Sequence, residues 1–427
     1  MTDEIFNYDV VIVGGGNAAC CAAHAAIERT KSVCIIEKAP KLERGGNSAM
    51  TGHMRYAFNG MDDLRPLVKN MSENELRKLL EGGLPKRTEA DIWDEIMRVT
   101  NNQSDEDLLH AHVTESLKTV HWLASKGHDW VPSPATNDNV LSMNGGGMGL
   151  GKRNFAMLEQ AGVIFHYETA ATELIEGKTG RITGVRALTP AGYVQFNGKS
   201  IVLACGGFEA NAEMRARYLG PGWDTVHVRG VPYNTGDGLR MAMDIGALPF
   251  GSWSTCHASP QDIAIPKFTM PSAHVHSESK HRYMYPYSIM VNLKGERFVD
   301  ESWDTRGRTY ASMGREVLAQ PGGIAIQILD AKIREMGIYL HNYKNATTAK
   351  ADTLEKLAEE LGLPVANFMK TVREYNAAVQ PGNYNPNRYQ LDGKGTASIH
   401  PPKSHYALTI DKPPKVKVMP QRVGQAS

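Results

Sequence analysis

The sequence predicts an α/β fold built on a Rossmann-like domain, and three observations indicate it. Apolar, β-rich runs at residues 8–13 and 33–36 flank a glycine-led segment of helical character. A later apolar run, residues 199–207, follows a predicted β-meander at Arg181–Phe196 and also ends in glycines. At 427 residues, the chain exceeds the length at which one hydrophobic core stops growing. We therefore expect a second domain or an inserted cap.

The first strand, its glycines and the following helix have the spacing of a dinucleotide-binding βαβ unit. Gly14 falls at the tight turn, Gly16 where backbone must approach a pyrophosphate, and Ala19 where the helix packs closely on the strand. Amides at the start of that helix, including those of Asn17 and Ala18, would hold the phosphates. This order of elements predicts a dinucleotide site.

An acid closes the second strand of this unit. Glu37 follows Gly16 by about 20 residues, the spacing at which a carboxylate accepts hydrogen bonds from an adenosine ribose. An unphosphorylated ribose is favoured over that of NADP, and the adjacent Lys38 is assigned to the same site.

The loop after this unit favours FAD over NAD. Residues 44–52 read RGGNSAMTG, a polar, glycine-rich loop whose hydroxyls and amides suit phosphate and ring-edge contacts. An NAD domain has no standard need for such a loop. The run at residues 199–207 predicts a buried strand, and Asp237 is the expected N-cap of a helix at Leu239–Ile245. The remaining candidates for cofactor binding are Gly46, Asn47, Ser48, Thr51, Gly52, Gly206 and Asp237.

Composition narrows the class of protein. A net charge of +1, with no long block of one sign, argues against a nucleic-acid partner. The acidic N-terminus lacks the order of a secretory signal, and the most apolar stretch, Val10–Ile27, is interrupted by glycines and His24. We expect a cytoplasmic protein without a membrane span, whose cysteines are free thiols. Cys256, beside His257, is the cysteine most worth attention.

Several helical segments carry no recognisable chemistry. Residues 61–130 are mostly polar with helical spacing, as in Glu89–Val99 and Asp107–Ser125, and are expected to cover the nucleotide domain. The segments Thr353–Leu361 and Val365–Val379 also have apolar spacing near 3.6. Met143–Gly151 contains five glycines and would either approach the flavin or simply turn the chain.

Widely spread segments together resemble one family. In chain order they read VVIVGGGNAA, RGGNSAMTG, MNGGGMGL, IVLACGGFEAN, NTGDGLRMA, Cys256-His257-Ala258 and GERFVDESWDTRGRTYA. Their order over residues 8 to 410 is similar to that of the FAD-binding flavoproteins of fumarate reductase and succinate dehydrogenase, in particular the tricarballylate dehydrogenase-like branch. Each segment is only moderately specific, whereas the ordered set is strong.

This resemblance implies a Rossmann-like FAD-binding domain with an inserted α+β substrate-capping domain. The FAD-binding domain would comprise residues 1–230, with a helical excursion at about 61–130, and the cap residues 231–380. Residues 381–427 would be an incomplete return to the first domain and a divergent tail. Asn47 stands roughly where covalent-flavin members carry the attaching histidine, so non-covalent FAD is implied.

The same resemblance assigns the catalytic candidates. Hydride transfer between a carbon acid and flavin requires a group for the second proton and cations that hold substrate carboxylates. Arg306 lies where fumarate reductases carry the arginine that moves the proton, and His257 matches a histidine that hydrogen-bonds a substrate carboxylate. Because an arginine pKa is too high for an ordinary base, a nearby acid would relay protons: Asp300, Glu301 or Asp304.

Other readings of these basic residues stay open. Arg308 is an alternative by spacing, and Arg282 would be a further carboxylate-binding candidate. Surface ion pairs explain most arginines in most proteins. The histidines at 274 and 276 are two residues apart, so they would lie on one face of a strand and could bind a metal together with Glu278 and His281. Neither the spacing nor the family supports a metal site.

The C-terminal end departs from the family. Members return from the cap to the FAD domain with a glycine-rich strand and helix, for which Lys412–Ser427 offers no match. We expect an FAD-dependent oxidoreductase that transfers hydride between the carbon–carbon bond of a small polycarboxylate and flavin, with an unidentified electron partner. The alternatives are a catalytically impaired flavin- or nucleotide-binding remnant and an NAD-linked dehydrogenase.

Overall fold

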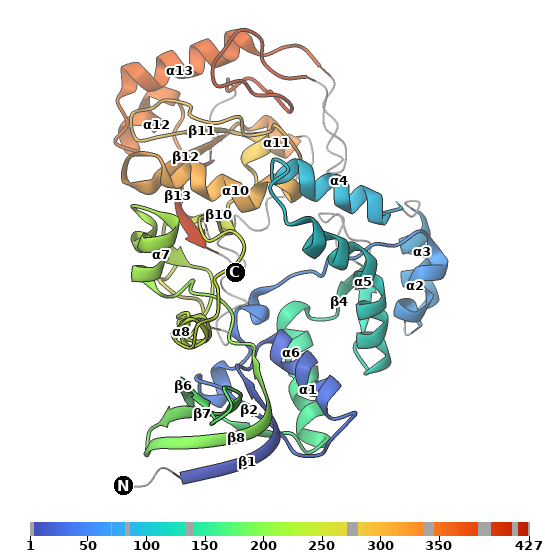
Figure 1. Ribbon diagram of the computed structural model, residues 1–427. Helices are drawn as coiled ribbons and strands as arrows, with labels where there is room; N and C mark the ends of the chain where they lie inside the picture. The colour runs from blue at the N-terminus through green and yellow to red at the C-terminus, as the bar shows by residue number, and fades with distance from the viewer. Residues whose placement is uncertain are drawn as a thin grey trace. The chain divides into compact units, whose positions relative to one another are not determined.

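The computed structural model describes residues 4–69, 71–81, 86–132, 141–270, 281–335, 346–382, 394–411 and 417–425 (Figure 1). The chain divides into two compact units. Unit 1 comprises residues 1–211, 230–252 and 270–272, and unit 2 comprises residues 212–229, 253–269 and 273–427. The chain therefore passes between the units several times.

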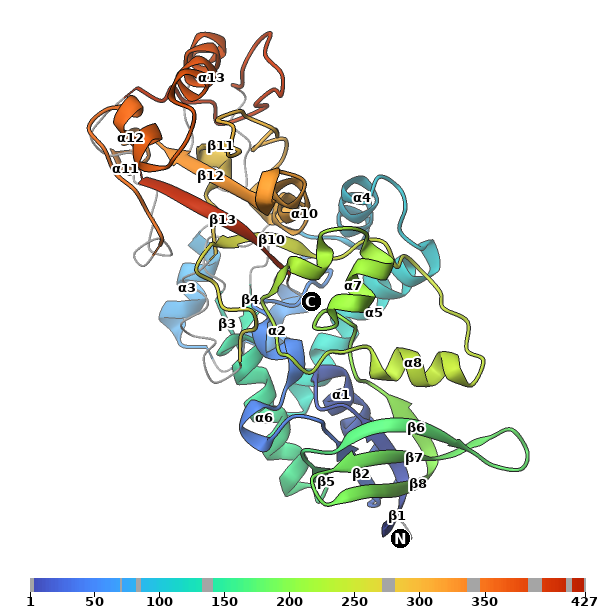
Figure 2. The ribbon, with the colours of Figure 1, turned by 90° about the vertical axis from the view of Figure 1, so that its left-hand side faces the viewer.

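Unit 1 is built on a six-stranded sheet of order β5-β2-β1-β8-β7-β6 (Figure 2). Strands β5, β2, β1 and β8 run parallel, whereas β7 pairs antiparallel with both β8 and β6. The predicted second strand is confirmed at its predicted bounds, and the first begins earlier than predicted. The strands are β1 Glu4–Val13, β2 Val33–Ile36, β5 Ile164–His166, β6 Ala170–Glu176, β7 Ile182–Thr189 and β8 Gly192–Leu203.

Successive side chains of the central strands point to opposite faces of the sheet, and both faces of the unit 1 sheet are apolar. Ile12 and Ile35 face helices α1 (Asn17–Ala26) and α6 (Gly146–Gln160), which lie side by side. Val11 and Ile36 face the opposite way, toward a cluster that includes Met241 of α8 (Asp237–Asp244). The predicted buried strand at 199–207 is wrong in its end and in its burial. The strand ends at Leu203, which is 37% exposed, and none of the residues 199–207 is buried.

Much of the segment from residue 61 to residue 125 is helical, and this segment belongs to unit 1. It comprises α2 Met61–Val68, α3 Glu73–Glu81, α4 Glu89–Val99 and α5 Glu106–Ser125, followed by the hairpin of β3 Trp130–Pro132 and β4 Leu141–Met143. Local signals start the two longest of these helices. Thr88 and Asp91 form a capping box at α4, and the Asp105 side chain accepts from the Leu108 amide at α5.

Unit 2 contains a five-stranded sheet in which β10, β13, β12 and β11 lie in order and β9 pairs with β13. Alternate residues of β11 pack on opposite faces: Ile289 and Val291 contact the cluster of α12 and α13, while Met290 faces α10. The elements are α7 Ala212–Leu219, β9 His227–Val228, β10 Ala258–Asp262, β11 Ile289–Val291, α10 Arg306–Leu318, β12 Ile324–Leu329, α11 Lys332–Glu335, α12 Leu354–Glu360, α13 Val365–Ala378 and β13 Lys417–Gln425.

Residues that the sequence assigns to a tail form β13. This strand pairs antiparallel with β12 and β10 and parallel with β9. Pro420 lies within it, opposite Ile326. The predicted helices near residues 353–361 and 365–379 are confirmed as α12 and α13. No helix among the described residues is long and apolar enough to cross a bilayer.

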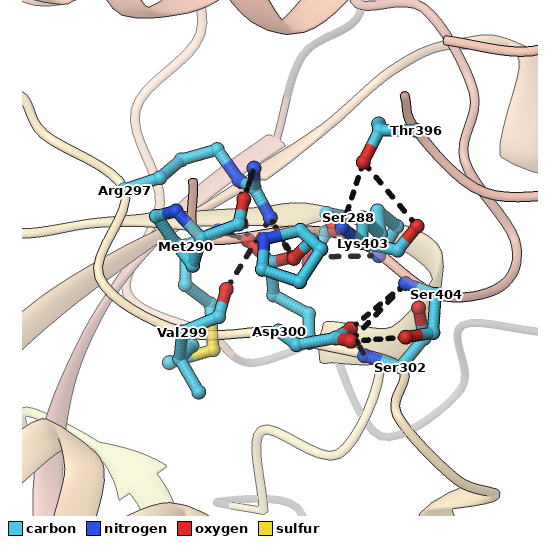
Figure 3. A network of polar contacts seen from close by, with 12 residues as sticks. Ser288, Met290, Arg297, Val299, Asp300, Ser302, Thr396, Lys403 and Ser404 are labelled. Atoms are coloured by element: carbon cyan, nitrogen blue, oxygen red, sulfur yellow. Dashed lines mark hydrogen bonds and ion pairs between the residues drawn. The ribbon is translucent and has the colours of Figure 1, made fainter. Parts of the chain in front are cut away.

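A buried group of charges ties together three segments of unit 2 (Figure 3). Glu301 is fully buried and accepts hydrogen bonds from Arg297, with Nη2 to Oε2 at 2.7 Å, and from the amide of Met290 at 2.8 Å. Lys403 Nζ lies 3.8 Å from Glu301 Oε2. The single negative charge of Glu301 therefore lies beside two positive charges, those of Arg297 and Lys403. The remaining donors of the Lys403 ammonium group must then bond neutral acceptors.

Main-chain carbonyls provide those acceptors. Lys403 Nζ donates to the oxygens of Pro286 at 2.8 Å and Ser288 at 2.9 Å. The neighbouring Ser404 donates from its amide and hydroxyl to Asp300. Burial lowers the pKa of Lys403 to about 8, and the Glu301 carboxylate opposes that shift. Segment 394–411 is therefore attached to the two chain segments that precede α10.

Replacing Gly14 tests the tight turn of unit 1. Gly14 has φ +105°, and a Cβ there would overlap the carbonyl of Ala204. We expect Gly14→Ala to lower the free energy of unfolding by about 2 kcal/mol or more, measured by urea denaturation. Gly52→Ala is the matched control, since a Cβ at Gly52 meets nothing within 4 Å. Equal stability of the two variants would contradict the close approach.

Lys403→Met tests the buried cation. Because the pKa of Lys403 in the folded protein is about 8, below that of an unfolded lysine, its charge opposes folding at neutral pH. This penalty is relieved as pH rises from about 8 toward the ordinary lysine pKa. Wild type should therefore gain unfolding free energy relative to Lys403→Met between about pH 7 and about pH 10.

The same series with Lys356→Met, which removes an exposed lysine of α12, is the control for general alkaline effects. A difference between wild type and Lys403→Met that stays constant over this range would refute the proton release.

Candidate functional site

The glycine turn of unit 1 brings the ends of three strands together. The Gly14 amide donates to the Ile36 carbonyl at 2.8 Å, while the Ala204 amide donates to the Val13 carbonyl at 2.8 Å. A Cβ at Gly15 would come within 2.6 Å of Glu37 Oε2. Because no side chain fits at Gly14 or Gly15, the backbone itself forms the surface of the turn, as a close-approaching pyrophosphate requires.

The start of α1 offers amides to an anion. Its first intrahelical bond runs from Cys20 N to Gly16 O at 3.1 Å, so the three preceding amides have no partner within the helix. The Asn17 amide donates to Ser48 Oγ at 3.0 Å, and Ala18 is exposed. Gly16 supplies no side-chain cap. The predicted residues Gly16, Asn17, Ala18 and Ser48 are thus adjacent, with amide dipoles that favour negative charge.

Glu37 folds back onto this turn. Its carboxylate accepts from the Ala39 amide at 2.7 Å and lies beside Gly15. Burial raises the pKa of Glu37, against the lowering effect of the backbone amides of Ala39 and Gly15. A buried carboxylate next to the glycine turn has remaining acceptor positions that suit ribose hydroxyls.

Lys38 and Asp237 form an ion pair at the same edge of the sheet. Lys38 Nζ lies 2.7 Å from Asp237 Oδ2, and the Thr235 hydroxyl donates to the same carboxylate at 2.9 Å. The expectation that Asp237 is an N-cap is wrong. Gly236 occupies the cap position with φ +80°, and Asp237 begins α8. The left-handed conformation that the turn needs favours glycine there, which moves the acid into the first helical turn.

Asn47 presents an unsatisfied donor inside unit 1. Its Oδ1 accepts from the Val231 amide at 2.9 Å, and the residue is 7% exposed. Its Nδ2 is buried and makes no hydrogen bond within the described part of the chain. Buried polar groups normally have partners, so this donor fits an acceptor supplied by a bound molecule, such as a carbonyl or ring nitrogen of a flavin.

Two other residues of the loop at 44–52 are held by contacts with α6. Arg44 stacks 4.1 Å over the ring of Phe155 and bonds Glu159 at 2.7 Å. The Thr51 carbonyl accepts from the Gly147 amide at 2.9 Å, and a Cβ at Gly147 would overlap the Ser48 carbonyl.

Glycines 146 and 147 therefore pack directly on the predicted cofactor loop. The stretch 143–151 is not a loop throughout, because α6 begins at Gly146. Gly52, in contrast, has no neighbour within 4 Å that an added Cβ would meet.

Gly206 and Gly46 both lie close to Asn234, and Gly46 also lies close to Gly16. A Cβ at Gly206, where φ is +72°, would lie 2.7 Å from Asn234 Nδ2. A Cβ at Gly46 would lie 3.9 Å from both Asn234 Oδ1 and the Gly16 Cα. Asn234, which begins the NTGDG motif, was not among the predicted site residues although it contacts two of them.

Unit 2 holds the predicted catalytic residues on one aromatic cluster. Arg306 is the first residue of α10, and its guanidinium lies 5.5 Å from the centre of the Tyr283 ring. Tyr283 packs on Tyr310 with ring centres 5.3 Å apart, and Tyr310 meets the His257 ring edge-on at 5.0 Å. Burial raises the pKa of Tyr283. The two tyrosines bring Arg306 and His257 together, a link that sequence spacing did not predict.

Arg282 does not serve as a carboxylate-binding candidate. It is fully buried and forms a close ion pair with the equally buried Asp262, while Nη1 donates to the His281 carbonyl at 2.8 Å. Arg308, the alternative to Arg306, lies 3.4 Å from Asp304 and is partly exposed.

Of the three acids considered for proton relay, Asp300 and Glu301 belong to the charged group around Lys403. Asp304 remains beside the start of α10, where it accepts from the Thr305 amide at 2.6 Å.

Metal binding finds no support in the part of the chain that the structure describes. No group of three or more potential ligands occurs there. The histidines 274 and 276 and Glu278 lie outside the described residues, whereas His281 stacks on Tyr283 at 4.6 Å. All five cysteines are free thiols.

Several curated proteins are similar to this chain over part of their own length. A NADH:acrylate oxidoreductase of Vibrio harveyi is 26% identical over 439 residues, covering 88% of this chain and 41% of the relative. A fumarate reductase (cytochrome) of Shewanella frigidimarina is 26% identical over 385 residues, covering 88% and 61%. A 3-oxosteroid 1-dehydrogenase of Mycobacterium tuberculosis is 28% identical over 248 residues, covering 53% and 42%. The chain spans about half the length of these curated relatives.

Solved structures share the fold. The open conformation of a flavocytochrome c3 fumarate reductase superimposes with TM-score 0.67 at 23% identity, covering 98% of this chain and 67% of the other. A 3-ketosteroid-Δ4-(5α)-dehydrogenase from Rhodococcus jostii gives TM-score 0.67 at 19% identity, covering 98% and 84%. A family model described as the FAD binding domain matches residues 9–410. The chain therefore belongs to the FAD binding domain family, and its cofactor is FAD.

Proposed function

We propose that this chain is an FAD-dependent oxidoreductase that transfers hydride between flavin and the carbon–carbon bond of a small polycarboxylate. The substrate class is tricarballylate-, fumarate- or succinate-like. Relatives named for acrylate and fumarate act on short carboxylic acids, which supports this class. The electron donor or acceptor is a separate, unidentified partner.

The aromatic cluster of unit 2 is the observation that carries the proposal. A substrate with two or more carboxylates needs fixed cations or donors, and the reaction needs a group that moves one proton. Arg306, held over the Tyr283 ring at 5.5 Å, would move the proton, and His257 would hold a carboxylate. Asp304, adjacent in sequence to the N-cap Thr305, would exchange protons with Arg306.

The residues of unit 1 would hold the cofactor. FAD supplies the two-electron acceptor or donor when bound. The amides at the start of α1 would bind its phosphates, Glu37 its ribose, and the buried Nδ2 of Asn47 an acceptor on the ring. The binding set is proposed to be Gly14, Gly16, Asn17, Ala18, Glu37, Lys38, Gly46, Asn47, Ser48, Thr51, Gly206 and Asp237, with Gly52 the weakest member.

Non-covalent attachment and a cytoplasmic location complete the proposal. An asparagine amide is a poor nucleophile, so Asn47 would contact the flavin by hydrogen bonding. Free thiols at all five cysteines are typical of a reducing compartment.

Cofactor release tests the unit 1 site. We expect the purified full chain, or the chain incubated with FAD, to show flavin absorbance at a stoichiometry near one, because the glycine turn and α1 amides are in place. Heat or acid precipitation should leave all of the flavin in the supernatant, identified as FAD by chromatography. Flavin that stays with the pellet would contradict non-covalent binding, and a folded protein that never takes up FAD would favour the remnant alternative.

Arginine variants test the chemistry. Arg306→Ala should lower kcat/KM for reduction of fumarate, or oxidation of tricarballylate, by about 100-fold or more, because proton transfer by a positioned group contributes at least this much. The measurement uses an artificial electron carrier, so that the natural partner need not be known. Arg308→Ala should cost less than about fivefold, since Asp304 pairs with that side chain near the surface.

Arg315→Ala, at an exposed position of the same helix, is the matched control for effects on α10. A large loss in Arg308→Ala with little effect of Arg306→Ala would mean that the wrong arginine has been chosen. Turnover of a 3-oxosteroid but of no polycarboxylate would overturn the substrate class.

A further inference from the structure

A chain of buried polar groups lies directly behind the glycine turn. His24 of α1, His128 after α5 and Asn154 of α6 are 3%, 2% and 0% exposed. Both imidazole Nε2 atoms meet the same oxygen, Asn154 Oδ1, at 3.1 Å from His24 and 2.9 Å from His128. Asn154 Nδ2 then reaches Asn17 Oδ1 at 3.3 Å. None of these contacts is explained by the proposed reaction.

The orientation of the Asn154 amide in the structure sets the direction of this network. The amide oxygen of Asn154 faces both imidazoles and only accepts, so in this orientation both imidazoles donate to it from Nε2. With its oxygen occupied twice, Asn154 presents its NH₂ group to Asn17, whose Oδ1 accepts. Burial lowers the pKa of both histidines, that of His128 to about 4, so both are neutral near pH 7. A reversed Asn154 amide would require both imidazoles to accept at Nε2, and its oxygen would then face Asn17.

The orientation of Asn17 follows from that of Asn154. Its Oδ1 is held inward, where the Cys21 thiol also approaches at 3.9 Å. Its Nδ2 makes no hydrogen bond to any residue that the structure describes, although the side chain is only half-buried. Asn17 is also the first residue of α1, where the helix amides favour an anion. The side chain thus turns its donor, and not its oxygen, away from the buried network.

We propose that Asn154, supported by His24 and His128, is a positioning residue that orients the Asn17 amide so that Asn17 Nδ2 donates to the diphosphate of the bound dinucleotide. This inference rests on the proposed FAD site. It adds a side-chain donor to the backbone amides of α1, and it gives the two buried histidines a role. A carboxamide rotated by half a turn would instead direct an oxygen at the phosphates, with like partial charges opposed.

A double-mutant cycle separates this role from simple packing. Asn154→Asp has nearly the same shape and still accepts from both histidines, but it cannot donate to Asn17 Oδ1. The Asn17 amide should therefore rotate and direct its oxygen outward. The probes are ADP, which carries the diphosphate, and adenosine, which lacks it, with affinity measured by calorimetry on the full chain. FAD binding is followed in parallel by flavin fluorescence.

Asn154→Asp should weaken ADP and FAD binding by about 10-fold or more, and adenosine binding by less than about twofold. In the Asn17→Ala background, the same substitution should change ADP affinity by less than about threefold, because the group through which it acts is absent. An undiminished effect of Asn154→Asp in that background, or an equal effect on adenosine, would overturn the inference.

A second pair of variants keeps the test independent of how well Asn154→Asp folds. Asn17→Asp leaves the buried network intact and places an oxygen where the donor lies, so it should weaken ADP binding at least about fivefold more than Asn17→Ala does. Equal affinities for these two variants would also refute the inference. Failure of the wild-type chain to bind ADP or FAD is a different outcome, which would remove the dinucleotide site itself and this inference with it.

Discussion

The close approach of backbones at Gly14 is the constraint on which the rest of unit 1 depends. At this point β1 ends between β2 and β8, and a hydrogen bond from Gly14 to Ile36 ties the turn to the neighbouring strand. The positive φ of Gly14 directs the chain into α1, whose small residues Ala19 and Ala23 then pack directly on the sheet. With the helix start so placed, Glu37 and the loop at 44–52 converge on it. The positive φ of Gly14 therefore sets the place where β1, α1, the end of β2 and the loop at 44–52 meet.

Sequence reasoning succeeded where backbone geometry sets the spacing. The βαβ unit requires glycine and acid at fixed intervals, and these were recognisable without any tertiary information. Sequence reasoning failed where contacts between residues far apart in the sequence determine the arrangement. Nothing near Asn154 in sequence indicates that two distant histidines share its oxygen, and nothing around Tyr283 indicates that it joins Arg306 to His257. Such contacts come from packing between elements, which local patterns do not encode.

The strand at 417–425 was missed for a different reason. Its basic residues and Pro420 are typical of an edge or a tail, because proline cannot donate to a neighbouring strand. In the structure this proline lies opposite Ile326 and the strand pairs on both sides. Asp237 was misplaced by one residue because an acid and a glycine both suit the start of a helix, and the required positive φ decided in favour of Gly236. The family assignment survives both errors, since it depends on the order of widely separated motifs.

The interleaving of the two units has a consequence for how this protein can be dissected. Unit 1 is assembled from residues on either side of α7 and its following turn, which belong to unit 2. No single cut of the chain therefore releases either unit as one continuous polypeptide. An isolated flavin-binding fragment would have to rejoin residues 211 and 230 by an engineered linker. Evolutionary exchange of unit 2 among relatives would likewise demand several coordinated crossovers.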